Sequence, residues 1–224
     1  MTIKIIGVIG AGTMGGGSGI AHLAAERGFE VILYGEEQHL VDCAMKRIAG
    51  YIDRKIGKRK DTIEEKEAVL KRITTTTKLA DLAPVDLLFE AIFDDIETRK
   101  SAIKELDKIC RAEIIFCSNT SDMSFTALAS VTSRPDKVVG LKFFNPPQII
   151  RRVEVIRGFH TSDETVALAT EAAQAIGKVP VVLLDEAYRT EGDVTSEEVA
   201  REFRLGLYYP VGPFENDYSG TEVH

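Results

Sequence analysis

Short runs of apolar residues alternate along this chain with longer segments whose apolar residues recur every three or four positions. Runs of about four to eight apolar and β-branched residues are typical of strands that are buried on both faces of a parallel sheet. Such runs lie at residues 3–9, 29–34, 86–92, 113–121, 137–144, 151–158 and 179–184. Since helical segments separate most of them, the pattern predicts an α/β fold in which right-handed crossovers join parallel strands.

The segments between these runs have the spacing of amphipathic helices. The clearest one starts at about Gln38, where apolar residues at positions 41, 45, 48, 52 and 56 form one face. A polar stretch follows it and predicts a turn and a second helix, with Asp61 or Thr62 as the cap. Further helices are expected after the glycine-rich stretch at 10–17, over about 96–110 and over 163–176.

The pattern changes after Leu184, where no further apolar run of strand length occurs. The sequence SEEVAREF has helical spacing, with Thr195 or Ser196 as its cap. A segment of this length cannot form a core of its own, so it packs on the first domain, pairs with another subunit or stays partly loose. We therefore expect one α/β domain over residues 1–185 and a truncated helical C-terminal segment over residues 186–224.

Composition narrows the class of protein. The 224 residues include 28 basic and 35 acidic side chains, which gives a net charge of −7, and 44% of the residues are hydrophobic. These values are typical of a soluble globular protein. The acidic balance argues against a general surface for nucleic acid or anionic membranes.

The cysteines and the N-terminus indicate a cellular location. Cys43, Cys110 and Cys117 are scattered and form no CxxC pair, so they suit free, mostly buried thiols in a reducing compartment. The first residues, MTIKIIGVIG, lack the pattern of a signal peptide, and no apolar run is long enough to span a membrane. The expected location is the cytoplasm.

The first apolar run leads directly into VIGAGTMG, which fits the GxGxxG fingerprint of dinucleotide-binding proteins. Gly10 permits the tight turn, Gly12 lets the backbone approach a pyrophosphate, and Gly15 permits close packing of helix and strand. Thr13 and Met14 complete the loop, and the phosphates would lie at the free N–H groups of the helix N-terminus. A glycine-rich turn without a ligand is the alternative interpretation.

The residue at the end of the second strand indicates whether NAD or NADP binds, because an acidic residue there hydrogen-bonds the adenosine ribose. Gly35 occupies that place in this chain, and Glu36 and Glu37 follow it. Glu36 can reach the ribose from one position further on, and two carboxylates disfavour the 2′-phosphate of NADP. The sequence therefore predicts NAD as the cofactor.

Several segments resemble the 3-hydroxyacyl-CoA dehydrogenase family, which includes bacterial 3-hydroxybutyryl-CoA dehydrogenases. In family order they read GVIGAGTMG, SGIA, FEAIFDD, SNTS, GLKFFNP, VEVIRG, TSDET, IGKVPVV and LGLYYPVGPFE. The resemblance implies a Rossmann-type, doubly wound and mostly parallel sheet followed by a helical domain. It implies reversible oxidation of the 3-hydroxyl of an acyl-CoA by NAD, as in the β-oxidation of fatty acids. It also implies a homodimer, which the short C-terminal segment would weaken.

The resemblance further implies roles for the residues that match the family's site. In the family a histidine of an HFFNP motif takes the hydroxyl proton, and Glu154 matches the glutamate that orients this histidine. Ser121 and Asn145 match the side chains that hold the substrate oxygen and the nicotinamide end. Asp94 stands where the family has a glutamate near the nicotinamide ribose, and Arg99 stands where it has a lysine.

Lys58 matches a lysine that meets the phosphates of coenzyme A. It belongs to a basic cluster over residues 55–60, which without the resemblance would be interpreted as a solvated helix end. Both interpretations stay open.

The chain departs from the family at three places. Lys142 replaces the histidine. An ordinary lysine is protonated at neutral pH, and a neighbouring Glu154 carboxylate would stabilise that ammonium. Gly16 and Gly17 look like a two-residue insertion at the start of the helix. After Asp185 a segment of the family's pattern is missing, and the helical domain is cut short.

Three functions are consistent with this sequence. The first is an NAD-dependent 3-hydroxyacyl-CoA dehydrogenase, slowed by the lysine, in which Lys142, Glu154 and Ser121 act on the substrate. The second is a non-catalytic NAD-binding scaffold, and the third is an engineered or shortened variant of the family. No metal site is indicated. The enzyme comes first because lineage usually sets the substrate class.

Overall fold

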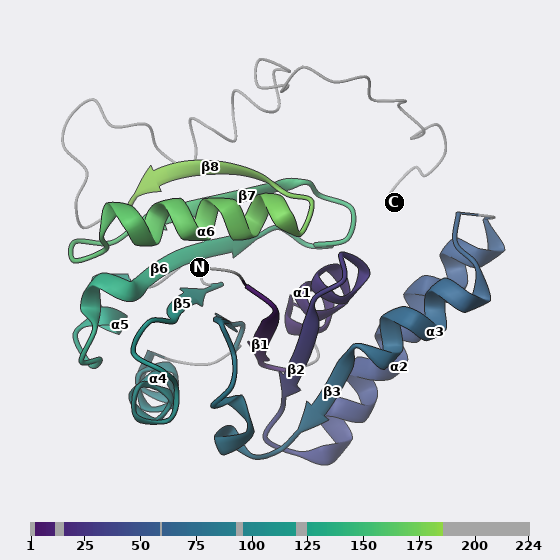
Figure 1. The fold of residues 1–224 in the computed structure, drawn as a ribbon, viewed down its shortest axis with the longest axis horizontal. Coiled ribbons are helices and arrows are strands. Elements are labelled where there is room, and N and C mark those ends of the chain that lie inside the picture. The colour runs from purple at the N-terminus through teal and green to yellow at the C-terminus, as the bar shows by residue number, and fades with distance from the viewer. Residues whose placement is uncertain (1–2, 12–15, 59, 93–95, 120–124, 186–224) are drawn as a thin grey trace, which may run out of the picture. The chain divides into compact units, whose positions relative to one another are not determined.

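The computed structural model describes residues 3–11, 16–58, 60–92, 96–119 and 125–185 of the chain (Figure 1). Its strands are β1 (Ile5–Ile9), β2 (Glu30–Tyr34), β3 (Ile73–Thr76), β4 (Leu87–Glu90), β5 (Ile115–Ser118), β6 (Val138–Phe143), β7 (Arg152–Arg157) and β8 (Val179–Leu184). Its helices are α1 (Gly16–Glu26), α2 (Gln38–Gly57), α3 (Ile63–Lys71), α4 (Ile96–Ile109), α5 (Phe125–Ala129) and α6 (Asp163–Ala175), with short 3₁₀ helices η1 (Leu79–Leu82) and η2 (Pro135–Lys137).

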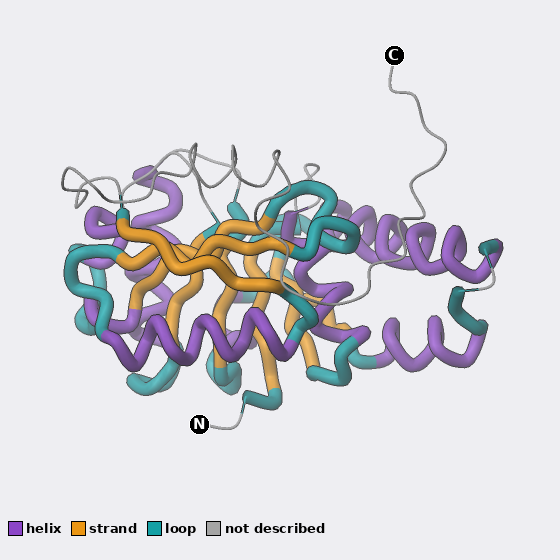
Figure 2. The backbone as a smooth tube through the Cα atoms, turned by 90° about the horizontal axis from the view of Figure 1, so that it is seen from above, coloured by secondary structure: helices purple, strands orange, loops and turns teal. Residues whose placement is uncertain are grey.

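The strands form one eight-stranded sheet in the order β3-β2-β1-β4-β5-β6-β7-β8. Neighbouring strands are parallel, except that β6 and β7 are antiparallel. The chain builds outward from β1 to β3 and then returns to place β4 on the other side of β1, so the sheet is doubly wound. Helices flank the strands on both sides (Figure 2). This topology confirms the predicted Rossmann-type, mostly parallel fold.

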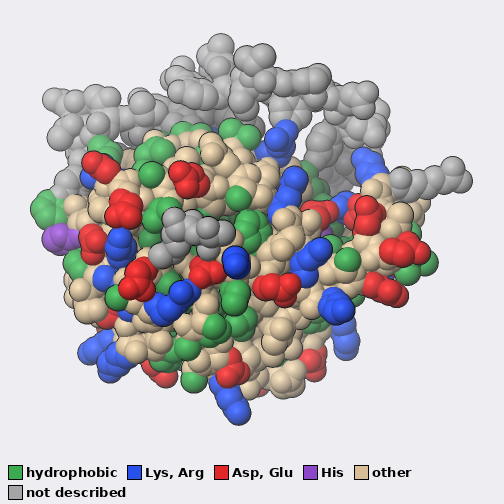
Figure 3. All heavy atoms as spheres, in the orientation of Figure 1, with side chains coloured by type: hydrophobic (Ala, Val, Ile, Leu, Met, Phe, Trp, Pro, Cys, Tyr) green, Lys and Arg blue, Asp and Glu red, His purple; other side chains and the backbone are tan. Residues whose placement is uncertain are grey.

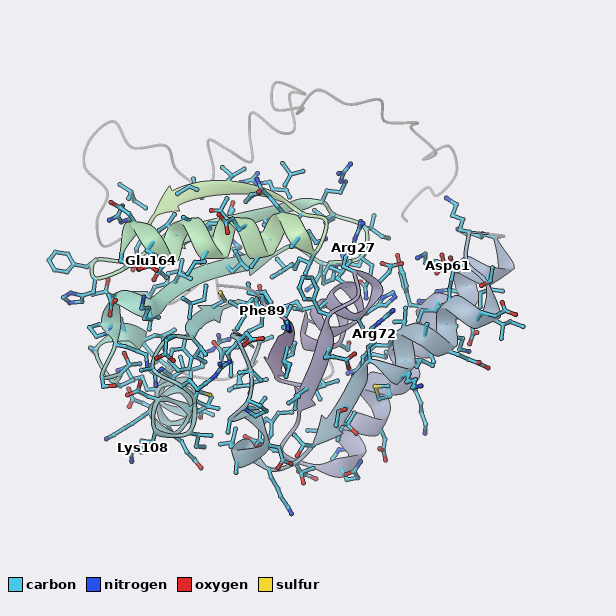
Figure 4. All side chains as sticks on the ribbon, in the orientation of Figure 1. Arg27, Asp61, Arg72, Phe89, Lys108 and Glu164 are labelled. Carbon is cyan, nitrogen blue, oxygen red and sulfur yellow. The ribbon has the colours of Figure 1, made fainter. Side chains whose placement is uncertain are left out.

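The hydrophobic core lies between the sheet and its helices. Phe89 of β4, which Figure 4 labels within the sheet, is almost fully buried, as are Ile6 of β1 and Leu33 of β2. Burying one such side chain contributes about 1.5–3 kcal/mol to folding. Helix α1 is buried over most of its length, because its glycine, alanine and serine residues let it approach the sheet closely.

Helix α3 begins at one of its two predicted caps. The Thr62 hydroxyl accepts a hydrogen bond from the Glu65 backbone N–H at 3.2 Å, and the Glu65 carboxylate accepts one from the Thr62 N–H at 2.7 Å. This capping box satisfies two backbone donors that the first helical turn leaves open. Asp61, the other candidate cap, forms an ion pair with Lys55 at 2.8 Å instead.

Two strands differ from what the sequence pattern predicts. β3 was not expected, because only Ile73 is strongly apolar in its four residues; its threonines suit a strand at the edge of the sheet. β7 runs antiparallel to β6 although an α/β pattern favours parallel neighbours. The connection over residues 144–151 is too short for the crossover that a parallel pair needs.

The expectations for the C-terminal segment lie outside the described residues. This holds for residues 186–224 as a helical unit and for the caps Thr195 and Ser196, so the domain division stays a prediction. None of the helices in the described ranges is long and apolar enough to cross a membrane.

The three cysteines are free thiols. Cys110 and Cys117 are buried as expected, whereas Cys43 on α2 is exposed. Burial raises the pKa of the Cys110 thiol to about 11 and raises the pKa of Cys117 as well. Both buried thiols are therefore protonated near neutral pH, which fits a packing role.

Candidate functional site

The site forms where the carboxyl ends of the central strands meet. Strands β1 and β4 are neighbours, and the chain leaves them in opposite directions. Ile9, Glu90 and Ser118 stand side by side in register at the ends of β1, β4 and β5. In open α/β sheets, ligands bind in the crevice beside such a reversal of strand order.

Gly10 begins the turn that follows β1, and its φ angle of 109° favours glycine. A Cβ atom at this position would overlap the carbonyl oxygen of Ala91. Gly10 therefore permits the tight turn that the fingerprint predicts. Gly12, Thr13, Met14 and Gly15 lie outside the described residues, so their roles stay predictions.

Gly17 makes a close contact between helix α1 and the end of strand β1. A Cβ atom at Gly17 would overlap the Gly10 carbonyl oxygen, a backbone atom that cannot move aside. Helix α1 starts at Gly16. Gly16 and Gly17 thus lie in the first turn of the helix, and this turn packs against the end of β1.

The predicted ribose contact lies at the end of β2. Gly35 is buried there, and a Cβ atom on it would crowd the side chain of Ala11 at 2.9 Å. Glu36 follows as an exposed residue. Its carboxylate is accessible to a ribose, and this role stays a prediction.

Arg99 is buried beneath the site rather than exposed within it. Its Nη1 atom lies 3.1 and 3.0 Å from the two carboxylate oxygens of Glu90. The Ser118 hydroxyl also donates to Glu90, and the backbone N–H of Ile92 donates to it at 2.6 Å. Burial raises the pKa of the Glu90 carboxyl, and the Arg99 charge opposes that rise. The cluster joins α4 to the ends of β4 and β5; Asp94 lies outside the described residues.

Lys142 and Glu154 face each other across the β6–β7 ladder. They are register partners, and the Lys142 Nζ atom lies 3.7 Å from Glu154 Oε2. The Glu154 side chain is 1% exposed, whereas the Lys142 side chain is 24% exposed. The resemblance required these two residues to be adjacent, and the structure brings them together. Ser121, the third proposed catalytic residue, lies outside the described residues.

Glu154 has a second cationic neighbour that the sequence reasoning missed. The Arg152 guanidinium, almost fully buried, donates to Glu154 Oε1. Both Arg152 and Lys142 also lie over the ring of Phe144, at 5.2 and 5.4 Å from its centre. The signal was present in RRVEV, because residues two apart on a strand share one face.

Asn145 is the second residue of the loop over residues 144–151, and it is exposed. Asn119, which the SNTS motif contains but which was not singled out, holds the neighbouring strand end: its Oδ1 atom accepts from the Phe143 N–H at 2.8 Å. The two asparagines therefore lie at adjoining strand ends of the same sheet edge.

A cavity of about 500 Å³ lies beside Asn145. Its lining comes from α1, from α2 and from the loop after β6, and it comprises Ser18, Lys46, Arg47, Ile48, Gly50, Tyr51, Arg54, Asn145, Pro146, Pro147 and Gln148. Three of these side chains are cationic. Lys58 is not among them; it is exposed at the C-terminal end of α2. On the face shown in Figure 3, acidic and basic side chains are otherwise interspersed.

The fold and the glycine turn define a Rossmann-type dinucleotide-binding protein. Residues 5–187 match the family described as 3-hydroxyacyl-CoA dehydrogenase, NAD binding domain. The chain is 38% identical over 238 residues to a probable 3-hydroxybutyryl-CoA dehydrogenase from Deinococcus radiodurans, which covers 97% of this chain and 84% of that protein. It is 36% identical over 239 residues to a 3-hydroxybutyryl-CoA dehydrogenase from Bradyrhizobium diazoefficiens, with 99% and 81% covered.

A solved structure gives the same result. The (S)-3-hydroxybutyryl-CoA dehydrogenase from Ralstonia eutropha superimposes with a TM-score of 0.81 at 33% identity, covering 93% of this chain and 74% of that one. The chain therefore belongs to the 3-hydroxyacyl-CoA dehydrogenase family of oxidoreductases, and its domain binds NAD.

The described residues fit this cofactor. Gly10 makes the tight turn after β1, and α1 starts at Gly16 with its backbone close to that turn, so the free N–H groups of the helix N-terminus lie near the strand end, where a pyrophosphate binds in such folds. The exposed Glu36 carboxylate stands past the end of β2, where an adenosine ribose lies in such folds. NAD bound here would accept or donate the hydride.

Proposed function

We propose that this protein catalyses reversible hydride transfer between NAD and the 3-hydroxyl carbon of an acyl-CoA. The observation that supports it is the Lys142 amine, which is partly exposed at the carboxyl end of β6 and backed by the buried carboxylate of Glu154. The amine lies at the same edge of the sheet as the Gly10 turn.

Lys142 acts as the general base in oxidation and as the general acid in reduction. When the 3-hydroxyl is oxidised, its carbon loses a hydride and its oxygen loses a proton, which a neutral Lys142 amine accepts. In the reverse direction the ammonium donates a proton to the carbonyl oxygen. Glu154 stabilises the ammonium, while Ser121 and Asn145 hold the substrate oxygen and the nicotinamide end.

The cationic cavity supports coenzyme A as the carrier of the substrate. Lys46, Arg47 and Arg54 surround a space that adjoins Asn145, and cations of this kind attract phosphate groups. Lys58 follows Arg54 by one helical turn, so it extends the same basic stripe towards the end of α2. We assign the phosphates of coenzyme A to this stripe and the acyl chain to the region of Lys142.

Activity is tested with acetoacetyl-CoA and NADH, followed by NADH absorbance. We expect turnover at neutral pH, and we expect Lys142→Met to lower it by about 10²- to 10⁴-fold, the loss typical of a missing general acid or base. Lys142→His should speed up oxidation near neutral pH, because imidazole is partly neutral there.

The control is Lys108→Met, which removes an exposed amine from the last turn of α4. It should leave the rate unchanged. Equal rates in the wild type and in Lys142→Met would contradict the role of Lys142.

The second candidate is a non-catalytic NAD-binding scaffold. The Glu154 carboxylate at 3.7 Å favours the Lys142 ammonium, and an ammonium cannot accept a proton. NADH binding, measured by fluorescence, without turnover in either direction from about pH 6 to about pH 10 would establish this candidate.

We further propose how the whole chain is organised. Residues 1–185 form the NAD-binding domain, and residues 186–224 form a shortened helical segment that supports a weak homodimer. The free thiols suit a reducing compartment, so we place the protein in the cytoplasm, acting on acyl-CoA and not on nucleic acid or membranes. Light scattering of the full chain over a range of concentrations tests the dimer.

A further inference from the structure

Lys178 is a buried lysine that contacts the loop over residues 144–151, although about thirty residues separate the two along the chain. It lies in the turn between α6 and β8 and is 6% exposed. Its Nζ atom donates hydrogen bonds to the carbonyl oxygen of Pro147 and, at 2.8 Å, to that of Ile150. The same amine faces the ring of Phe143 at 6.0 Å. One side chain thus connects the end of β6 with both halves of the following loop.

This loop forms one wall of the cationic cavity. Asn145, Pro146, Pro147 and Gln148 all line the cavity. Two internal hydrogen bonds shape the loop, because the N–H groups of Ile149 and Ile150 donate to the Pro146 carbonyl at 3.0 and 3.1 Å.

Two separate elements contact the loop. Gly19 of α1 packs so closely on Pro147 that a Cβ atom there would crowd the proline ring at 2.7 Å. Lys178, from the turn between α6 and β8, also contacts the loop and satisfies two of its carbonyl groups. Proline carries no N–H group, so a loop with two prolines has few donors of its own.

We propose that Lys178 is a positioning residue for the acyl-CoA site: its amine clamps the loop over residues 145–150 and so fixes Asn145 and the cavity wall. This inference rests on the proposed function of the cavity. The clamp itself rests only on the contacts of the amine.

The charge state of the Lys178 amine makes the opening of the loop depend on pH. The charged groups that face it in the described residues are Arg27 at the end of α1 and Arg151 before β7, both cationic. Burial first, and then these two charges, lower the pKa of Lys178 from 10.5 to about 8. A neutral amine has two hydrogens, one for each carbonyl, so the contact persists when the proton leaves.

Linkage then fixes the sign of the pH effect. Opening the loop exposes Lys178 to water, where its pKa returns to its ordinary value, so opening takes up a proton above about pH 8. Opening therefore becomes rarer as the pH rises. Between about pH 7 and about pH 9 the population of the open loop falls about tenfold.

Hydrogen exchange of the loop tests the clamp without any assay of function. Exchange at residues 144–152 is measured by mass spectrometry at both pH values and corrected with an unstructured peptide of the same sequence. We expect about tenfold stronger protection at the higher pH in the wild type. In Lys178→Met the loop should exchange faster, and this pH dependence should vanish. Lys108→Met should behave as the wild type does.

A second measurement separates positioning from general stability. In Lys178→Met the KM for acetoacetyl-CoA should rise about tenfold and kcat should fall as well, because the loop carries both the cavity wall and Asn145. NADH affinity should change less, because it depends mainly on the Gly10 turn. Lys178→Arg, which keeps a donor, should recover part of the loss in KM.

Unchanged loop exchange in Lys178→Met overturns the clamp, because the clamp rests on the two hydrogen bonds of the amine. Faster exchange with an unchanged KM overturns the positioning role. If the wild type shows no turnover, the proposed function fails, and loop exchange alone decides the clamp. If Lys178→Met does not fold, Lys178→Gln takes its place, because its shorter side chain cannot reach both carbonyl groups, and unchanged loop exchange in that variant overturns the clamp.

Discussion

Glu154 is a buried carboxylate between two cations, and the two contacts differ. Arg152 donates a direct hydrogen bond, whereas Lys142 lies 3.7 Å away and remains partly exposed. A buried charge without a partner is costly, while a buried ion pair that is complete adds little net stability. Arg152 therefore compensates the buried charge of Glu154, and the Lys142 amine remains accessible to a substrate.

Arg152→Leu is the matching prediction at this scale. Removing one partner of a buried pair typically costs about 3–5 kcal/mol, and we expect a loss near the lower end because Lys142 still faces Glu154. Denaturant unfolding measures the change. The double variant with Glu154→Gln should regain at least half of the loss, because no uncompensated carboxylate remains. Additive losses in the double variant would contradict the pairing.

Two pieces of secondary structure set up the site at the scale of elements. The antiparallel β6–β7 pair brings Lys142 opposite Glu154, and the contact of α1 with β1 depends on Gly17. Since the helix N-terminus provides the free N–H groups for phosphate binding, its distance from the strand end decides whether NAD fits.

Gly17→Ala tests this helix contact. The new methyl group would collide with the Gly10 carbonyl, so we expect a loss of stability of about 1–3 kcal/mol and weaker NADH binding. Gly50→Ala on α2 is the matched control, because a Cβ atom there meets nothing within 4 Å. It should stabilise the protein by up to about 1 kcal/mol. Equal NADH affinity in both variants would show that the contact is irrelevant to binding.

At the scale of the whole molecule, a buried histidine, His22, links the stability of the protein to pH. His22 of α1 is 1% exposed, meets the ring of Tyr51 edge-on at 5.2 Å, and has no hydrogen-bond partner for either ring nitrogen among the described residues. Burial lowers its pKa; Lys55 adds to this effect, while Glu26 and Asp61 oppose it. The folded protein therefore holds His22 in its neutral form.

The expected outcome is a loss of stability in mild acid. The pKa of His22 is lower in the folded than in the unfolded chain, so below the ordinary value of 6.5 the unfolded chain binds more protons. The free energy of unfolding should fall between about pH 7 and about pH 5, by at most about 1.4 kcal/mol for each pH unit below 6.5. His22→Phe should reduce this fall, as urea unfolding at both pH values would show. An identical fall in the variant would assign it to other groups.

Local signals in the sequence predicted most of the fold. Seven of the eight strands of the sheet are apolar runs, and Thr62 capped its helix as the pattern indicated. The sequence pattern did not predict β3, because a strand at the edge of a sheet needs few apolar residues. For the site, motif positions identified Gly10, Lys142 and Glu154. These residues could be predicted because their position in a turn or a strand is enough to place them at the site.

What the sequence by itself determined is the order of elements, the dinucleotide turn and the family, since each is encoded in spacings of a few residues. Only the tertiary structure decided which side chains meet: Arg152 on Glu154, Arg99 beneath the site on Glu90, and the Lys178 amine on a loop some thirty residues away. The physical reason is that these contacts depend on strand register and helix packing. They join residues whose separation along the chain carries no periodic signal.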